Sequence, residues 1–261
     1  MAMKRALTIG INDYPTAPLR GCVHDAERWA EYFSDLCGFD RVKTLKNREA
    51  KISRVTKEIR DILTVSVPGD VVRIHFSGHG TRVPDLSDDE ADGMDEALVL
   101  YDGVWLDDQI SDLLNDMPNG VDLGFISDSC HSGGVTRNAF VATRGRQRFM
   151  PFPGIGAITA ATRLHRLFNP NAETSHAGLV GTMNHVLLSG AKSDESAWDV
   201  EYGGQPWGAM SFHAISLLVE NPRLTWKELH ERLLTRLPSS IAPQTPQLES
   251  KMTSVHFRVG G

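Results

Sequence analysis

The sequence predicts an α/β fold built on a mostly parallel central sheet of about six strands, with helices on both faces. Two observations support this class. Apolar, β-rich runs alternate along the chain with segments of helical periodicity. Two of the runs, DVVRIHF (70–76) and VDLGFIS (121–127), are apolar almost throughout. Such continuous apolar runs are typical of parallel strands that are buried on both faces.

The first half of the chain alternates regularly between the two kinds of element. We expect strands at 5–11, 42–45, 70–76, 97–101 and 121–127, and helices near 22–37, 51–63 and 106–117. In the first helix Ala26, Trp29 and Phe33 recur at helical spacing, and Gly38 supplies a C-terminal stop.

The second half of the chain is less regular. Residues 136–176 carry Arg, Pro, Gly and Asn without a clear period, which indicates a long linker or surface loops. Regular elements return with a strand at 185–191, helices near 208–220 and 225–236, and a final strand at 254–259.

Composition excludes several classes of protein. Of the 261 residues 41% are hydrophobic, and the formal net charge is −6, which argues against a nucleic-acid-binding protein. Three cysteines are too few for a disulfide framework and favour a reducing compartment. The apolar run near the start, in MAMKRALTIGIND, is too short for a signal peptide or an anchor, so we expect neither, and no stretch approaches 18 apolar residues. We therefore expect a soluble, cytoplasmic protein without nucleic-acid or membrane partners.

Polar residues follow two of the predicted buried strands. Strand 70–76 runs into Ser77-Gly78-His79-Gly80, and strand 121–127 runs into Asp128-Ser129-Cys130. Because sites in parallel sheets lie beyond the carboxyl ends of the strands, we expect His79 and Cys130 to meet there. An imidazole can take the thiol proton and return it to a leaving amine. The backbone N–H groups of Gly80 and Cys130 are candidates for an oxyanion hole. The competing interpretation is a buried structural cysteine and an ordinary loop histidine.

These segments resemble the metacaspases, the caspase-related cysteine peptidases found outside animals. The resemblance rests on Ser77–Gly80 and Asp128–Gly133, and it extends over most of the chain through further matches: Gly10-Ile11-Asn12, Cys22–Ala26, Asp107-Asp108, Leu188–Gly190 and Gly208–Ser211. It implies a single caspase-like peptidase domain over 1–261, with a large-subunit part (1–136), a linker (137–176) and a small-subunit part (177–261). It also implies a monomer. Some relatives have an N-terminal prodomain, and we expect none here because the first predicted strand begins at residue 5.

The resemblance further implies cleavage of peptides and proteins after Arg or Lys. Asp25, Ser77 and Asp128 match residues that line the acidic S1 pocket of the family, the pocket for the residue before the scissile bond (P1). The chemistry agrees, because neighbouring carboxylates repel one another until a guanidinium joins them. The alternative is that Asp25 caps the first helix and Asp128 stabilises a loop.

The resemblance also suggests calcium as an activator, although no cofactor is required for the thiol chemistry. Asp95, Asp107 and Asp108 match three calcium-ligand positions of the family, but Arg137 stands where a fourth carboxylate is expected.

Four arginines, Arg137, Arg144, Arg146 and Arg148, crowd the segment after Cys130. They form either a solvated basic loop or a linker that enters the enzyme's own S1 pocket and is cut there. The main functional prediction is thus a Cys–His endopeptidase with basic P1 specificity. A catalytically silent, caspase-like regulatory or binding module is the alternative, and a thiol hydrolase or transferase for non-peptide substrates is a third.

Overall fold

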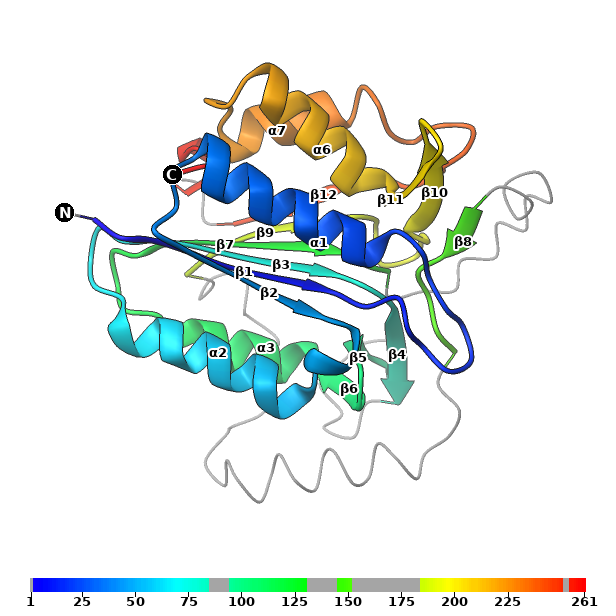
Figure 1. Cartoon of the computed structure of the whole chain (residues 1–261), viewed down its shortest axis with the longest axis horizontal. Helices are drawn as coiled ribbons and strands as arrows, with labels where there is room; N and C mark the ends of the chain where they lie inside the picture. Colours follow the sequence, from blue (N-terminus) through cyan, green and yellow to red (C-terminus); the bar gives the residue numbers. More distant parts are fainter. Residues whose placement is uncertain (1, 85–93, 131–144, 152–183, 251–253) are drawn as a thin grey trace.

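A computed structural model describes residues 2–84, 94–130, 145–151, 184–250 and 254–261. Its centre is a six-stranded sheet with the spatial order β12-β9-β7-β3-β1-β2 (Figure 1). The strands are β1 (Lys4–Gly10), β2 (Arg41–Lys46), β3 (Val71–Ser77), β7 (Asp122–Asp128), β9 (Val186–Ser189) and β12 (Gln247–Glu249). All neighbours pair in parallel except β12, which is antiparallel to β9. The predicted α/β class with a mostly parallel sheet is confirmed.

Helices cover both faces of this sheet (Figure 1). One face carries α1 (Cys22–Glu31), α6 (Ala209–Glu220) and α7 (Trp226–Leu233), and the other carries α2 (Ile52–Val65) and α3 (Asp107–Asn115). The expected first helix ends in a π-helical turn, Tyr32–Leu36, and a short 3₁₀ turn (Asn47–Glu49) precedes α2. Among the described residues no helix has the length and apolar character needed to span a membrane.

The alternation of side chains along β3 decides what each face receives. Val72, Ile74 and Phe76 join the apolar core beneath α2 and α3. Successive side chains of a strand point to opposite faces, so the intervening Arg73, His75 and Ser77 face α1, α6 and α7. Their contacts agree: the guanidinium of Arg73 lies over the Trp226 ring, and His75 lies against Trp29. The same alternation places Asp128 of β7 on the α1 face, in register with Ser77.

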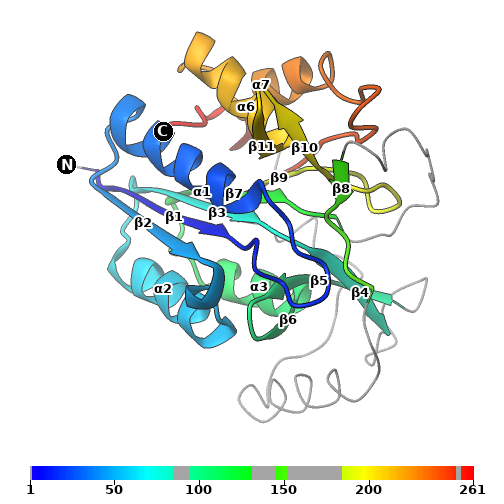
Figure 2. The same ribbon diagram turned by 45° about the vertical axis from the view of Figure 1, so that its right-hand side comes forward.

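Two small antiparallel sheets lie beyond the carboxyl ends of the central strands (Figure 2). One contains β4 (Gly80–Pro84), β5 (Met94–Leu100) and β6 (Gly103–Leu106), and the other contains β8 (Gly145–Gln147), β10 (Trp198–Tyr202) and β11 (Gln205–Gly208). Of these strands the sequence pattern predicted only β5. The others are three to five residues long, too short for a period-two pattern to emerge.

The strand predicted at 254–259 is wrong. This segment contains a 3₁₀ turn (Ser254–His256) and a single bridge from Arg258 to Thr225, and β12 forms the sheet edge instead. The reason is the buried guanidinium of Arg73, which donates to the carbonyl oxygens of Arg258 (3.0 Å) and Val259 (2.8 Å). Backbone acceptors that a strand would offer to a neighbour are thus satisfied by a side chain.

Gly124 of β7 lies against Trp226 of α7, and a Cβ there would come within 2.4 Å of the indole ring. Trp226 is fully buried, so the ring has little freedom to move away. We expect Gly124→Ala to lower the free energy of unfolding by about 1–3 kcal/mol, measured by urea denaturation.

Gly103→Ala is the matched control, because its Cβ would approach only the tip of Ile52, at 3.1 Å. Equal stability of the two variants would contradict the tight contact between β7 and α7.

Candidate active site

The predicted dyad residues lie just beyond neighbouring parallel strands. His79 follows the end of β3 by two residues, and Cys130 follows the end of β7 by two residues. Ser77 and Asp128 are partners in the β3–β7 register, so the two segments leave the sheet side by side. Topology therefore brings both residues to one edge of the sheet, as the sequence predicted.

The His79 ring is fixed by its surroundings. Its backbone N–H donates to the hydroxyl oxygen of Tyr14 (3.1 Å), whose ring centre lies 4.6 Å from the imidazole. Nε2 lies 2.6 Å from the carbonyl oxygen of Ala17. A carbonyl can only accept, so this contact places the ring proton on Nε2 and leaves Nδ1 as the basic nitrogen. Burial lowers the pKa of His79, although the Ala17 contact opposes this shift, and a neutral imidazole is the form that can accept a thiol proton.

The thiol of Cys130 is buried in a small apolar cluster with Ala191, Ala197 and Phe149. Burial raises the pKa of this thiol to about 12, although interactions with Ala197 and Ser196 oppose the shift. The sulfur is therefore protonated at neutral pH in this conformation and is a poor nucleophile.

The three residues predicted to line an S1 pocket are brought together and buried. Ser77 donates its hydroxyl hydrogen to Asp25 Oδ2 (2.7 Å), and Asp128 lies beside Ser77 across the strand register. Asp25, Ser77 and Asp128 each have no exposed surface. The first comes from α1 and the other two from the ends of β3 and β7.

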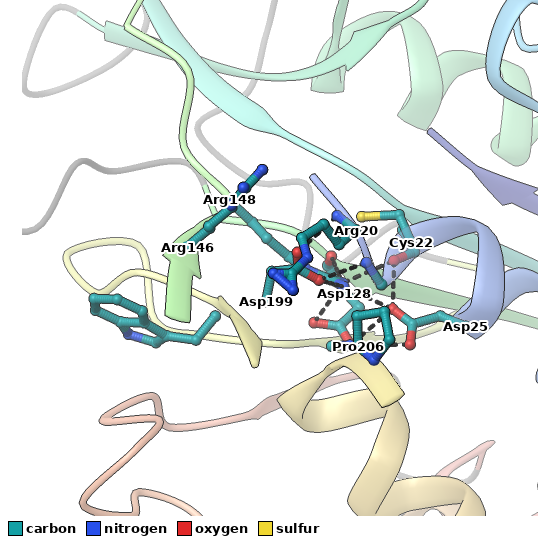
Figure 3. A network of polar contacts seen from close by, with 12 residues as sticks. Arg20, Cys22, Asp25, Asp128, Arg146, Arg148, Asp199 and Pro206 are labelled. Atoms are coloured by element: carbon teal, nitrogen blue, oxygen red, sulfur yellow. Dashed lines mark hydrogen bonds and ion pairs between the residues drawn. The ribbon is translucent and has the colours of Figure 1, made fainter. Parts of the chain in front are cut away.

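A fourth polar group, Asp199 of β10, belongs to the same cluster and was missed by sequence reasoning (Figure 3). The sequence pattern predicted no strand at β10, so it gave no reason to place Asp199 beside Asp25 and Asp128. Asp199 is 4% exposed.

The chain's own Arg148 fills the centre of these acidic groups (Figure 3). Its Nη2 lies 2.7 Å from Asp25 Oδ2 and 3.3 Å from Asp199 Oδ1. Its Nη1 lies 2.7 Å from Ser77 Oγ, 2.9 Å from the Asp128 carbonyl oxygen and 3.3 Å from Asp128 Oδ1. We call Asp25, Ser77, Asp128 and Asp199 the acidic pocket.

Helix N-termini hold the carboxylates of the acidic pocket in place. Gly208 N–H, at the start of α6, donates to both oxygens of Asp25 (2.9 and 3.1 Å), and Ser211 N–H donates to Asp128 Oδ2 (2.8 Å). Arg20 and Gly21, just before α1, each donate a backbone N–H to Asp199 at 2.8 Å. Neither helix has a capping side chain of its own. The carboxylates thus take the capping role, and the positive helix ends stabilise their charge.

Burial and the crowding of carboxyl groups shift the pKa of Asp25. Burial raises the pKa of Asp25 to about 6, and the charge of Asp128 adds to the shift, although Arg148 opposes it. The guanidinium of Arg148 therefore favours the ionised form of Asp25 inside the acidic pocket.

The backbone around Arg148 also makes paired contacts with the site. Strand β8 pairs antiparallel with β10, and Arg148 N–H then donates to the Ala197 carbonyl oxygen (2.9 Å). The Arg148 carbonyl oxygen accepts from Gly80 N–H (2.9 Å), one of the two predicted oxyanion donors. The N–H of Met150 donates to the Gly80 carbonyl oxygen (3.0 Å). Side chain and backbone together hold 145–150 as an extended segment across the site.

The predicted calcium ligands lie in a different region. Burial raises the pKa of Asp107, at the start of α3, to about 8, and the charges of Asp108, Glu96 and Asp95 add to this shift. The described residues nevertheless contain no group of three carboxylate, histidine or cysteine side chains placed to hold one metal ion. Arg137 lies outside the described residues, as do Arg144 and most of the predicted linker.

Comparisons with known proteins identify the family and the fold of the chain. A family model described as the metacaspase, peptidase C14 domain matches residues 4–138, more than half of the chain. Metacaspase-1A of Aspergillus oryzae is 28% identical over 94% of this chain and 67% of its own length. Metacaspase-1 of Candida glabrata is 28% identical over 95% of this chain and 72% of its own length.

Solved structures show the same fold. A protein from Geobacter sulfurreducens superposes with a TM-score of 0.78 and 26% identity, over 99% of this chain and 98% of that one. Caspase-1 from Spodoptera frugiperda superposes with a TM-score of 0.61 and 10% identity, over 95% and 86% of the two chains. The fold is therefore caspase-like, and the chain belongs to the metacaspases, a family of cysteine peptidases.

Proposed function

We propose that this protein is a cysteine endopeptidase that cleaves peptide bonds after Arg or Lys, with Cys130 as nucleophile and His79 as general base and acid. The acidic pocket carries the proposal, because its three carboxyl groups already bind one guanidinium inside the molecule. These carboxyl groups can form charge-assisted hydrogen bonds with Arg or Lys at P1, and their negative charge repels Asp.

The reaction that follows uses groups at the same edge of the sheet. His79 Nδ1 takes the thiol proton, and Cys130 Sγ attacks the carbonyl carbon of the P1 residue. The negative charge that develops on the carbonyl oxygen is stabilised by Gly80 N–H and Cys130 N–H. The C–N bond breaks as His79 returns its proton to the leaving amine, and water then hydrolyses the thioester.

Self-processing is part of this proposal, and Arg148–Phe149 is the bond that we assign to it. Arg148 offers both features of a substrate: its guanidinium lies in the acidic pocket, and its carbonyl oxygen lies on the Gly80 donor. The uncleaved chain is then a resting form, in which the pocket is occupied and the thiol of Cys130 is protonated.

The silent-module alternative has a specific observation in its favour, namely the same buried Arg148 and buried thiol. Under that hypothesis Arg148 is a permanent part of the core and the site never opens. Peptide hydrolysis and self-cleavage separate the two hypotheses.

Peptide hydrolysis gives the first test. We expect the protein to hydrolyse fluorogenic peptides with P1 Arg or Lys, and to leave P1 Asp peptides intact. Cys130→Ala removes the nucleophile and should abolish turnover, whereas His79→Ala should lower kcat about 10²–10⁴-fold by removing proton transfer. Activity that prefers P1 Asp, or that survives Cys130→Ala, contradicts the proposal.

The second test concerns the chain's own cleavage. Purified wild-type protein should separate into two fragments, the second beginning at Phe149, as determined by intact-mass measurement and N-terminal sequencing. Cys130→Ala and Arg148→Ala should each leave this bond intact.

Arg146→Ala is the matched control, because Arg146 precedes Arg148 by two residues but lies on the exposed surface. It should still be cleaved. If the wild-type enzyme is active but stays one unbroken chain, self-processing is refuted and the proposed peptidase activity is not.

Calcium activation stays a prediction, and the stability of wild type and of an Asp107→Asn variant tests it. The pKa of Asp107 lies above its ordinary value of 3.8, at about 8, so the folded chain binds more protons than the unfolded chain between these values. The contribution of Asp107 to the free energy of unfolding should therefore fall as pH rises from about 4 to 8, and Asp107→Asn should remove this contribution.

Calcium bound by the ionised carboxylates should restore stability at pH 8 in the wild type but not in Asp107→Asn. Urea denaturation with calcium or with a chelator measures this. The absence of any calcium effect on wild-type stability or peptide hydrolysis would contradict the calcium prediction.

A further inference from the structure

We infer that Asp199 is a specificity-determining residue that makes the acidic pocket select arginine over lysine at P1. This inference rests on the proposed peptidase function and narrows it. Neither the resemblance nor the sequence motifs placed Asp199 in the site.

The two terminal nitrogens of Arg148 have separate partners. Nη1 contacts Ser77 and Asp128, whereas Nη2 lies between Asp25 Oδ2 (2.7 Å) and Asp199 Oδ1 (3.3 Å). Only a planar guanidinium places donors at both positions at once.

A lysine side chain has one terminal nitrogen with three hydrogens. An ammonium that reaches the Ser77 and Asp128 side of the pocket cannot also occupy the Nη2 position between Asp25 and Asp199. Part of the buried negative charge then has no direct partner, which is costly away from solvent. The pocket should therefore accept lysine but bind it less well than arginine.

Asp199 is held rigidly enough to make this distinction. Its Oδ2 accepts from Arg20 N–H and its Oδ1 from Gly21 N–H, both at 2.8 Å, so its position does not depend on the guanidinium. A Cβ on Gly21 would lie 2.4 Å from Asp199 Oδ1, so only a glycine allows this close approach. A carboxylate that is fixed before the substrate arrives costs little ordering on binding.

The strand that carries Asp199 also binds the peptide backbone. Asp199 is the β10 partner of Arg146, two residues before Arg148, and Ala197 accepts from Arg148 N–H. The backbone register thus determines which side chain reaches Asp199. That side chain belongs to Arg148, the residue whose carbonyl oxygen accepts from Gly80 N–H.

The test compares P1 Arg and P1 Lys peptides that are otherwise identical. Asp199→Asn should lower kcat/KM for P1 Arg about ten- to hundredfold, the range expected for loss of a charged hydrogen-bond partner, and should affect P1 Lys much less. Glu201→Gln is the matched control, because Glu201 lies on the same strand with the same charge but is exposed, and it should change neither value. An equal loss for both peptides would overturn the role of Asp199 while leaving the peptidase proposal intact.

A second measurement does not require activity. In the Cys130→Ala chain, Arg148 itself serves as the bound guanidinium, and Arg148→Lys and Asp199→Asn are introduced singly and together. Arg148→Lys should lower the urea midpoint when Asp199 is present and lower it less when Asn stands there. Additive effects of the two changes would overturn the inference. Asp199→Ser, which keeps an acceptor for Gly21 N–H, replaces Asn if that variant does not fold.

If the wild-type protein hydrolyses neither peptide, the proposed function is refuted. The urea measurement would still decide whether Asp199 distinguishes the two side chains.

Discussion

Burying three carboxyl groups within reach of one another requires compensating positive charge, and the architecture around the site provides it in two forms. Fixed compensation comes from the N-termini of α1 and α6, whose backbone N–H groups bind Asp25, Asp128 and Asp199. Exchangeable compensation comes from Arg148, whose guanidinium lies between them. The fixed part positions the pocket, and the exchangeable part is what a substrate would replace.

This constraint also links distant parts of the chain. Asp25 lies on α1, Asp128 ends β7, Asp199 lies on β10, and Gly208 directly precedes α6. The close fit continues at Gly208, where a Cβ would lie 2.3 Å from Asp128 and 2.4 Å from Arg148. Emptying or protonating the pocket should therefore affect how both halves of the molecule pack, and not only how a substrate binds. A resting chain that supplies its own arginine avoids leaving these charges unpaired.

Much of this arrangement could be predicted from the sequence, because it depends on local pattern. Apolar runs with polar ends identified β3 and β7, and parallel pairing then brings His79 and Cys130 to one edge. Asp199 and the role of Arg148 could not be found in this way, since both depend on short strands whose pairing joins residues about 50 positions apart. The final strand was predicted wrongly for a related reason: the buried Arg73 takes backbone acceptors that the pattern assigned to a sheet.

If the acidic pocket delivers a basic P1 residue to Cys130, a reagent with such a residue should react covalently with this thiol. Peptide acyloxymethyl ketones with P1 Arg or P1 Asp would be incubated with wild type and Cys130→Ala, and the modified residue located by mass spectrometry. We expect one adduct, on Cys130, with the P1 Arg reagent only. Labelling of Cys130 by the P1 Asp reagent at the same rate, or no labelling of Cys130 by the P1 Arg reagent, would contradict it.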